Sequence, residues 1–330
     1  MEVPQKRFEV MQVIEKDMDA ILDEYLIPIE ENWQPSDIIP DPRGKDFVEQ
    51  VEGLRDVSQR LSTDLLVVLV GDTITEEALP TYESWLMDVV GVDQLTPNGW
   101  SRWVRRWTAE ENRHGDLLHK YLYLSGRIDM KEVEISTQHL ISDGFDLGIG
   151  ADPYLNFLYT SFQEMATNIS HRRVAALAQK SDDRLLANIC GTIAADEMRH
   201  AKAYMSFVKR FIEMDPSELM LAFLKIIKRQ IAMPAHYLRE SGEKRGELFA
   251  PFSNAAQRLG VYTAADYVDI LEMLLREWDI SRVGGLTDEA EKARDTLMAF
   301  PGRMRRVAKR LRVSDEVYPF KWIAKVGAPA

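Results

Sequence analysis

Two segments of the chain repeat one short pattern, Ala-acidic-Glu-x-Arg-His, at residues 109–114 and 195–200. Three helical residues advance by about 300°, so a Glu and a His at positions i and i+3 project from the same face of a helix. Each segment therefore offers one carboxylate and one imidazole to a single metal ion. The four side chains concerned are Glu111, His114, Glu197 and His200.

A further glutamate precedes each repeat in an otherwise apolar segment. Glu76 lies 35 residues before Glu111, and Glu164 lies 33 residues before Glu197. Four glutamates and two histidines directed inward from four helices are the ligand set of carboxylate-bridged di-iron and di-manganese sites, and such ligands suit both metals. A lone Glu-x-x-His is more typical of an exposed helix surface. Two of them on apolar stripes predict a buried metal centre, because burying these groups without a cation is costly.

Several neighbouring residues are placed to support such a centre. Glu110 and Asp196 each directly precede a glutamate of the repeats. We expect each to accept the second N–H of the opposite histidine, the alternative being an exposed acidic neighbour. Thr167 follows Glu164 by three residues on the same helical face, so its hydroxyl either faces the site or bonds its own backbone. His171 lies too far along the axis to be a ligand and is expected in the outer shell or the core.

The elements that must position these residues are predicted to be helices. Apolar residues recur at three- and four-residue steps after both histidines, which indicates buried stripes on long helices and an all-α fold class. Residues 65–70, LLVVLV, fit a buried strand as well as a buried helix. Pro80 lacks an N–H and should kink or end the helix one turn after Glu76. Pro301 and Gly302 are expected to interrupt the chain before a last, basic segment.

Composition excludes several classes of protein. The 330 residues are 45% hydrophobic, enough for one or two domains with a sizeable core. The longest apolar runs have six residues, whereas a membrane-spanning helix needs roughly 20, so no integral membrane insertion is expected. A net charge of -12 disfavours nucleic-acid binding. Cys190 is the single cysteine and the N-terminus has neither signal nor transit features, which favours a reducing compartment without encoded targeting.

Longer segments resemble the soluble acyl-[acyl carrier protein] desaturases of plant plastids and bacteria. The similar segments are WQPSDIIPDP, LVVLVGDTITEEALPTY, RWTAEENRHGDLLHKYLYLSGR, YTSFQEMATNISH, ICGTIAADEMRHAKAY, MPAHY and AQRLGVYTAADY. The resemblance implies two iron ions per subunit, bound by Glu76, Glu111, His114, Glu164, Glu197 and His200. It also implies that Thr167 assists oxygen activation, and that Trp33 and Asp196, with Glu110 nearby, lie on an electron route to the metals.

The resemblance further implies a fold and a reaction. The fold would be a single helical domain over residues 1–330 with a ferritin-like four-helix core and additional helices, including an N-terminal extension at 1–44. The protein would use O2 and two electrons from ferredoxin to insert a cis double bond into a saturated acyl chain on acyl carrier protein, in fatty acid biosynthesis. A homodimer is implied. The expected location is the cytoplasm of a bacterium, or the plastid stroma for a mature plant protein.

Five residues near the ligands are candidates for an acyl channel: Tyr82, Trp85, Val89, Phe157 and Met165. Two positions depart from the familiar plant enzymes, which usually have Met in place of Trp85 and Thr in place of Asp88. An indole or a carboxylate at the end of a pocket would shorten or reshape it. The acyl chain length and the double-bond position therefore cannot be transferred from those relatives.

The segment RMRRVAKRLR at 303–312 is the candidate docking surface for an acidic carrier protein, within a basic helix and tail at 303–330. It carries six basic residues beside an apolar stripe of Met304, Val307, Ala308 and Leu311. We expect the stripe to dock the helix while Arg303, Arg306 and Arg310 point outward and steer the carrier. The alternative is an ordinary solvated face.

Two other functions share the same ligands. A ferritin-like iron-handling or oxygen-scavenging protein would lack a substrate channel, and the chain's length beyond a bare bundle argues against it. A ribonucleotide reductase small subunit would hold a tyrosyl radical beside the metals, and Tyr82 or Tyr159 would be the candidate. A radical signal in electron paramagnetic resonance would distinguish this last alternative.

Overall fold

The computed structural model describes residues 3–229 and 231–324, which fold into α-helices and two 3-10 turns. Within these residues the only β pairing is an isolated bridge between Ile128 and Ile323. None of the helices they form is long and apolar enough to span a membrane. The helices are α1 Gln5–Glu15, α2 Met18–Tyr25, α3 Pro35–Ile38, α4 Phe47–Ser58, α5 Thr63–Glu77, α6 Leu79–Met87, α7 Gly99–Ser125, α8 Met130–Asp143, α9 Pro153–Lys180, α10 Arg184–Met214, α11 Pro216–Arg229, α12 Phe249–Leu259, α13 Ala264–Glu277 and α14 Asp288–Ala308.

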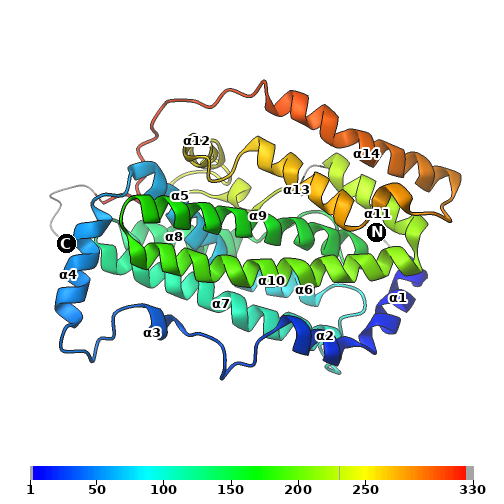
Figure 1. Ribbon diagram of the computed structural model, residues 1–330, viewed down its shortest axis with the longest axis horizontal. Helices are drawn as coiled ribbons and strands as arrows, with labels where there is room; N and C mark the ends of the chain where they lie inside the picture. The colour runs from blue at the N-terminus through cyan, green and yellow to red at the C-terminus, as the bar shows by residue number, and fades with distance from the viewer. Residues whose placement is uncertain (1–2, 230, 325–330) are drawn as a thin grey trace.

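Helices α5, α7, α9 and α10 form the central bundle, with α9 packed along α10 and α5 along α7. The added helices lie on two sides of it (Figure 1). On one side, α11, α13 and α14 pack together over α9, and α12 packs on α5. On the other, α2 and α3 contact α7 and α10. This is the expected ferritin-like, all-α architecture.

Helix α5 resolves the ambiguity at residues 65–70, which lie entirely within it. All six of these side chains are buried, and a helix that is apolar all round is typical of a bundle interior. The helix ends at Glu77, directly after the candidate ligand Glu76, and α6 begins at Leu79 with Pro80 in its first turn. The predicted break is present, but it falls at Ala78, two residues before Pro80, because a proline is tolerated in the first turn of a new helix.

The C-terminal helix differs from the expectation. Pro301 does not separate a basic helix from the preceding chain, because α14 begins at Asp288 and continues through Pro301 and Gly302. The buried face of α14, which includes Leu297 and Pro301, lies against α11 and α13. The residues that precede Pro301 therefore hold the helix on the body of the protein, and the basic segment begins in its last turns and continues past its end at Ala308.

The expected N-terminal extension at 1–44 contains α1, α2 and α3. Arg7 of α1 is buried, donates to Asp152 at the start of α9, and contacts Glu218 of α11 at 3.0 Å. These contacts fasten the extension to the bundle. Residues 1–2 of the extension and 325–330 of the predicted tail lie outside the described residues.

Candidate metal centre

The six predicted ligands converge inside the central bundle, each at most 9% exposed. They form two overlapping groups in which one ligand atom from each residue lies within 4.8 Å of the others. The carboxylates of Glu111 and Glu197 belong to both groups, so they are placed to bridge two ions. The groups are Glu76, Glu111, His114 and Glu197, and Glu111, Glu164, Glu197 and His200.

Both histidines direct Nδ1 toward the carboxylates. His114 Nδ1 lies 3.1 Å from Glu111 Oε2 and 3.2 Å from Glu197 Oε1. His200 Nδ1 lies 2.6 Å from Glu111 Oε1 and 3.8 Å from Glu164 Oε2. The i and i+3 spacing thus brings each Glu and His of a repeat to the same point, as the sequence predicts.

The polar atoms at this point fit a pair of cations. Among the described residues, four buried atoms crowd together here without forming a well-directed hydrogen bond: Glu111 Oε1, His114 Nδ1, Glu197 Oε1 and His200 Nδ1. Buried polar atoms are normally hydrogen-bonded, and divalent cations would satisfy all four. Burial, and then the charge of Glu197, raise the pKa of Glu76 to about 7. Oxygen ligands with imidazole suit iron and manganese.

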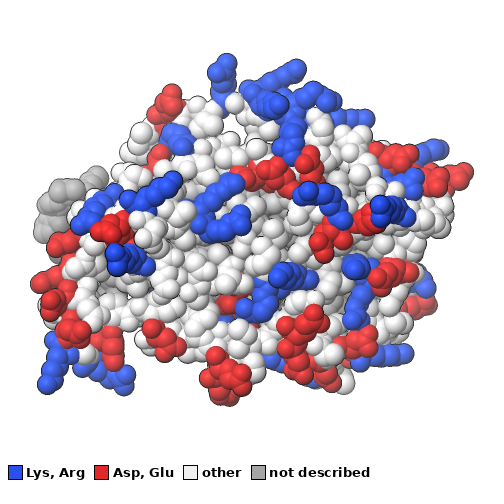
Figure 2. All heavy atoms as spheres, viewed as in Figure 1, with Lys and Arg blue, Asp and Glu red and all other residues white. Residues whose placement is uncertain are grey.

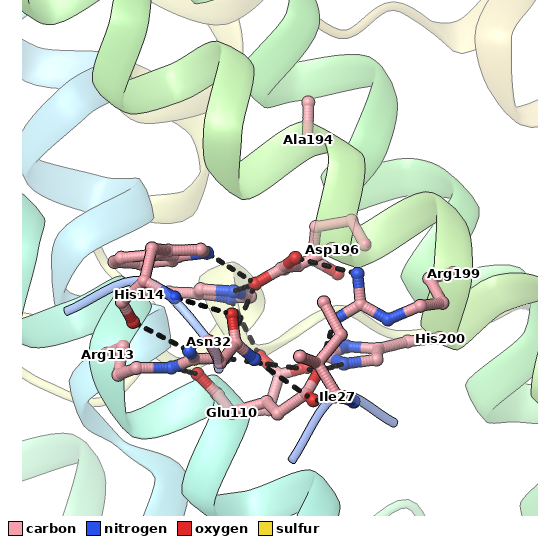
Figure 3. Close-up of polar contacts among 12 residues, drawn as sticks. Ile27, Asn32, Glu110, Arg113, His114, Ala194, Asp196, Arg199 and His200 are labelled. Carbon is pink, nitrogen blue, oxygen red and sulfur yellow. Dashed lines mark hydrogen bonds and ion pairs between the residues drawn. The ribbon is translucent and has the colours of Figure 1, made fainter. Parts of the chain in front are cut away.

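The other nitrogen of each histidine meets a carboxylate from the opposite repeat. His200 Nε2 lies 2.9 Å from Glu110 Oε2, and His114 Nε2 lies 3.3 Å from Asp196 Oδ2 (Figure 3). The predicted crossed pairing is therefore present in the structure. Trp33 Nε1 donates to Asp196 Oδ2 at 3.0 Å, and its ring stacks on His114 with centroids 6.1 Å apart. This places Trp33 beside the centre, while its part in electron transfer stays a prediction.

Three outer residues were not assigned a specific contact by sequence reasoning. His171 Nε2 lies 3.0 Å from Glu76 Oε1, so it contacts a ligand carboxylate across 95 positions of sequence. Arg113 and Arg199 directly precede the two ligand histidines, and both contact Asp196, at 3.5 and 2.8 Å. The sequence feature that points to the two arginines is that each stands at the same position of its repeat, directly before the histidine.

Thr167 lies on the wall of the cavity beside the ligands. Its Oγ1 is 2.7 Å from Glu197 Oε2 and 2.9 Å from the backbone oxygen of Glu164. The hydroxyl has one proton, so it donates to one of these oxygens at a time. Both partners expected from the sequence, the metal site and its own helix backbone, are within reach.

A cavity of about 460 Å³ leads from the ligands to the surface. Its inner end includes the ligand glutamates and Tyr82, and its outer end includes the apolar stripe from Met304 to Leu311 at and beyond the end of α14. Phe252 of α12 lines the wall between them. A cavity that joins a buried metal centre to solvent can admit an elongated apolar molecule.

Of the five predicted channel residues, Tyr82 lines this cavity and Trp85, Val89, Phe157 and Met165 are not among its lining residues. Trp85 packs edge-on against Tyr159 with centroids 5.5 Å apart, and Phe157 packs edge-on against Trp100 at 5.3 Å. Their roles in a channel therefore stay predictions.

The two candidate radical tyrosines both donate hydrogen bonds to backbone oxygens. Tyr82 donates to Thr75 at 2.9 Å, and Tyr159 donates to Ala232 at 3.0 Å. Burial raises the pKa of both phenols well above the ordinary value. Neither hydroxyl is directed at a ligand by these bonds.

The basic segment presents exposed charge at the outer end of the cavity. Arg303, Arg306 and Arg310 are exposed, and Figure 2 shows Lys and Arg side chains gathered over the last turns of α14. The expectation that the apolar stripe docks the helix is wrong, because Val307 and Leu311 remain 59% and 55% exposed. The stripe instead forms part of the cavity rim, and its role toward a carrier protein stays a prediction.

Comparisons with known proteins agree with this geometry. The family model described as "Fatty acid desaturase" matches residues 6–324. The chain is 46% identical over 327 residues to the chloroplastic stearoyl-[acyl-carrier-protein] 9-desaturase of Spinacia oleracea, covering 97% of this chain and 82% of that protein. It is also 46% identical to stearoyl-[acyl-carrier-protein] 9-desaturase 5 of Arabidopsis thaliana, with the same coverage.

A solved structure shows the same fold. The X-ray structure of the protein DesA2 of Mycobacterium tuberculosis superposes with a TM-score of 0.53 and 16% identity. The match covers 86% of this chain and 99% of that one. By its sequence similarity over nearly its whole length, the chain belongs to the acyl-[acyl carrier protein] desaturase family.

Proposed function

We propose that this protein is an acyl-[acyl carrier protein] desaturase that inserts a cis double bond into a saturated acyl chain. The observation that carries the proposal is a cavity that connects the two ligand groups with the apolar stripe at 304–311, beside which Arg303, Arg306 and Arg310 are exposed. An iron-storage protein needs the ligands and has no use for a largely apolar cavity of about 460 Å³. The family relationship supports the same conclusion.

We infer that the six ligands hold two iron ions in each subunit. Iron would supply the oxidising power that opens an unactivated C–H bond with O2, which side chains alone lack. Glu111 and Glu197 would help to hold both ions because each belongs to both ligand groups. Glu110 and Asp196 keep both imidazoles oriented through Nε2, and Thr167 holds a proton on Oγ1 beside Glu197 at the cavity wall.

The acyl chain would lie along the cavity with its methyl end toward Tyr82 and its thioester toward α14. The walls of the buried part exclude bulk water from the reacting carbons. An acidic carrier protein is repelled by a chain with a net charge of -12, so the exposed arginines at the rim would select its docking position. The exposed Val307 and Leu311 add apolar contact there.

The remaining parts of the proposal concern electrons, assembly and location. Ferredoxin is the proposed donor of two electrons, and Trp33, stacked on His114 and bonded to Asp196, is the proposed entry point. We further propose that residues 1–330 form one domain and that the protein is a homodimer. The proposed location is the bacterial cytoplasm, with the plastid stroma as the alternative.

The test is mass spectrometry of acyl products after aerobic incubation with reduced ferredoxin and a series of acyl carrier substrates, alongside iron analysis. We expect two irons per subunit and products that have lost two hydrogens, formed only with O2. Glu111→Ala and His200→Ala should each lose iron and product while circular dichroism still shows a folded bundle. Two bound irons with no product would favour the iron-handling alternative, and a tyrosyl radical signal would favour the reductase-like one.

A further inference from the structure

Arg199 contacts the carboxylates behind both ligand histidines. Its Nη1 donates to Asp196 Oδ1 at 2.8 Å and its Nη2 donates to Glu110 Oε2. Asp196 is the carboxylate behind His114, and Glu110 is the one behind His200. One rigid guanidinium thus spans the two outer carboxylates (Figure 3), and its planar fork fixes their separation in a way that a flexible ammonium cannot.

The charges of this outer layer balance. Glu110 and Asp196 are only 4% and 3% exposed, so each would be costly without a counter-charge. Arg199 supplies one positive charge, and Arg113 Nη2 supplies the second at 3.5 Å from Asp196. Two carboxylates therefore face two guanidinium groups.

The third donor of Arg199 leads to the N-terminal part of the chain. Its Nε donates to the backbone oxygen of Tyr25 at 2.9 Å. Residues 25–33, which we call the N-terminal strap, also reach the two carboxylates directly. The Ile27 amide donates to Glu110 Oε1 at 2.8 Å, and Trp33 Nε1 donates to Asp196. The strap and the outer layer thus share one hydrogen-bond network.

We propose that Arg199 is a positioning residue for the metal centre. It fixes the positions of Glu110 and Asp196 relative to each other, so that both imidazoles direct Nδ1 at the metals. It also couples this arrangement to the docking of the N-terminal strap. The inference rests on the proposed two-metal site and goes beyond its ligands. Coupling between two binding events is reciprocal. Metal binding should therefore slow hydrogen exchange in the N-terminal strap, and loss of Arg199 should lower the affinity for metal.

The test compares Arg199→Gln and Arg199→Lys with the matched control Arg210→Gln. Arg210 also lies on α10 and pairs with Asp17 of the N-terminal region at 2.6 Å, but does not contact Glu110 or Asp196 among its described contacts. Metal-free protein is titrated with Fe²⁺ or Co²⁺ against a competing chelator. Removing an outer partner typically costs about 10–100-fold in metal affinity, so we expect that loss in Arg199→Gln. We expect a smaller loss in Arg199→Lys, which keeps the charge, and none in Arg210→Gln.

Hydrogen exchange of the Ile27 amide gives the second readout. Metal should slow its exchange in the wild type and in Arg210→Gln, and should have little effect in Arg199→Gln. If that variant fails to fold by circular dichroism, the same comparison is made with Arg199→Lys. Wild-type protein that binds no metal would refute the proposed function itself. Two metals bound with wild-type affinity by the Arg199 variants, or equal losses in the Arg199 and Arg210 variants, would overturn the positioning role alone.

Discussion

Gly115 of α7 directly follows the ligand His114 and lies against the end of α5. A Cβ atom at this position would lie 3.0 Å from Glu77 Cγ, 3.1 Å from the Glu77 nitrogen and 3.3 Å from the carbonyl carbon of Glu76. The last two atoms are backbone and cannot rotate away. Gly115→Ala should therefore shift the end of α5, and with it the ligand Glu76, by a few tenths of an ångström.

The expected stability change is the difference between two opposing terms. Ala is favoured over Gly in a helix interior by about 0.8–1 kcal/mol, whereas overpacking typically costs about 1–3 kcal/mol. Gly191 on α10 provides the matched control, because nothing lies within 4 Å of its added Cβ. We expect Gly191→Ala to raise the free energy of unfolding by about 0.8–1 kcal/mol. The free energy of unfolding of Gly115→Ala should be lower than that of Gly191→Ala by about 1–3 kcal/mol.

Urea unfolding of the metal-free proteins measures this difference, and a metal titration measures the shift of Glu76. Because Glu76 belongs to one ligand group only, Gly115→Ala should lower the affinity for one of the two metal ions more than for the other. Gly191→Ala should bind both as the wild type does. If both variants gain the same stability and bind metal alike, the close approach of α5 and α7 does not constrain the site.

Three further predictions concern other parts of the molecule. Burial raises the pKa of Glu240 to about 7 from 4.5, so the stability it contributes is complete below pH 4.5 and is lost as pH rises through 7. Glu240→Gln should remove up to about 3 kcal/mol of the pH dependence of the free energy of unfolding, measured with urea. The same dependence on pH in both proteins would contradict the raised pKa of Glu240. Trp85→Met should move product distributions toward longer acyl chains in a mixed-substrate competition, by about fourfold per methylene at most, and an identical distribution would show that Trp85 is ordinary core. Replacing Arg303, Arg306 and Arg310 by Glu should raise the KM for acyl carrier substrate and flatten the salt dependence of KM. Unchanged kinetics would show that these arginines form an ordinary solvated face and do not dock the carrier.

The metal ligands could be predicted from sequence because their positions are local. A Glu and a His three residues apart share a helical face whatever the rest of the fold does, and the internal repeat indicates two such helices. Periodicity failed at residues 65–70 for a physical reason. A helix buried on all sides has no polar face, so its sequence cannot be distinguished from that of a buried strand.

The outer layer could be predicted only in part, because its contacts join distant segments. Asp196 and Glu110 were identifiable from their place in the repeats. The Ile27 donor is a backbone amide, which leaves no mark in the side-chain pattern. The channel shows a similar limit, since an inward-facing residue such as Phe157 either lines a cavity or packs on a neighbour, according to what a third helix places beside it.

The two sides of the metal centre are built differently, although the ligands themselves are nearly symmetric. On one side the cavity passes α5, α9, α12 and the segment 231–236, and residues such as Thr75, Thr167 and Phe252 line it. The outer carboxylates come from α7 and α10, and the N-terminal strap covers them there. Close packing of α12 on α5 through Phe252, whose ring a Cβ at Gly71 would meet at 2.0 Å, completes the cavity wall.

This division matters for the proposed reaction. A saturated chain must reach the metals through apolar walls that exclude water, whereas a charged hydrogen-bond network is what orients the imidazoles. Placing both on one side would put buried charges in the path of the substrate. Because the cavity reaches the ligands past α5, α9 and α12, while the outer carboxylates Glu110 and Asp196 lie behind the ligand histidines, each side can meet its own requirement. The proposed electron entry at Trp33 then lies on the charged side, away from the acyl chain.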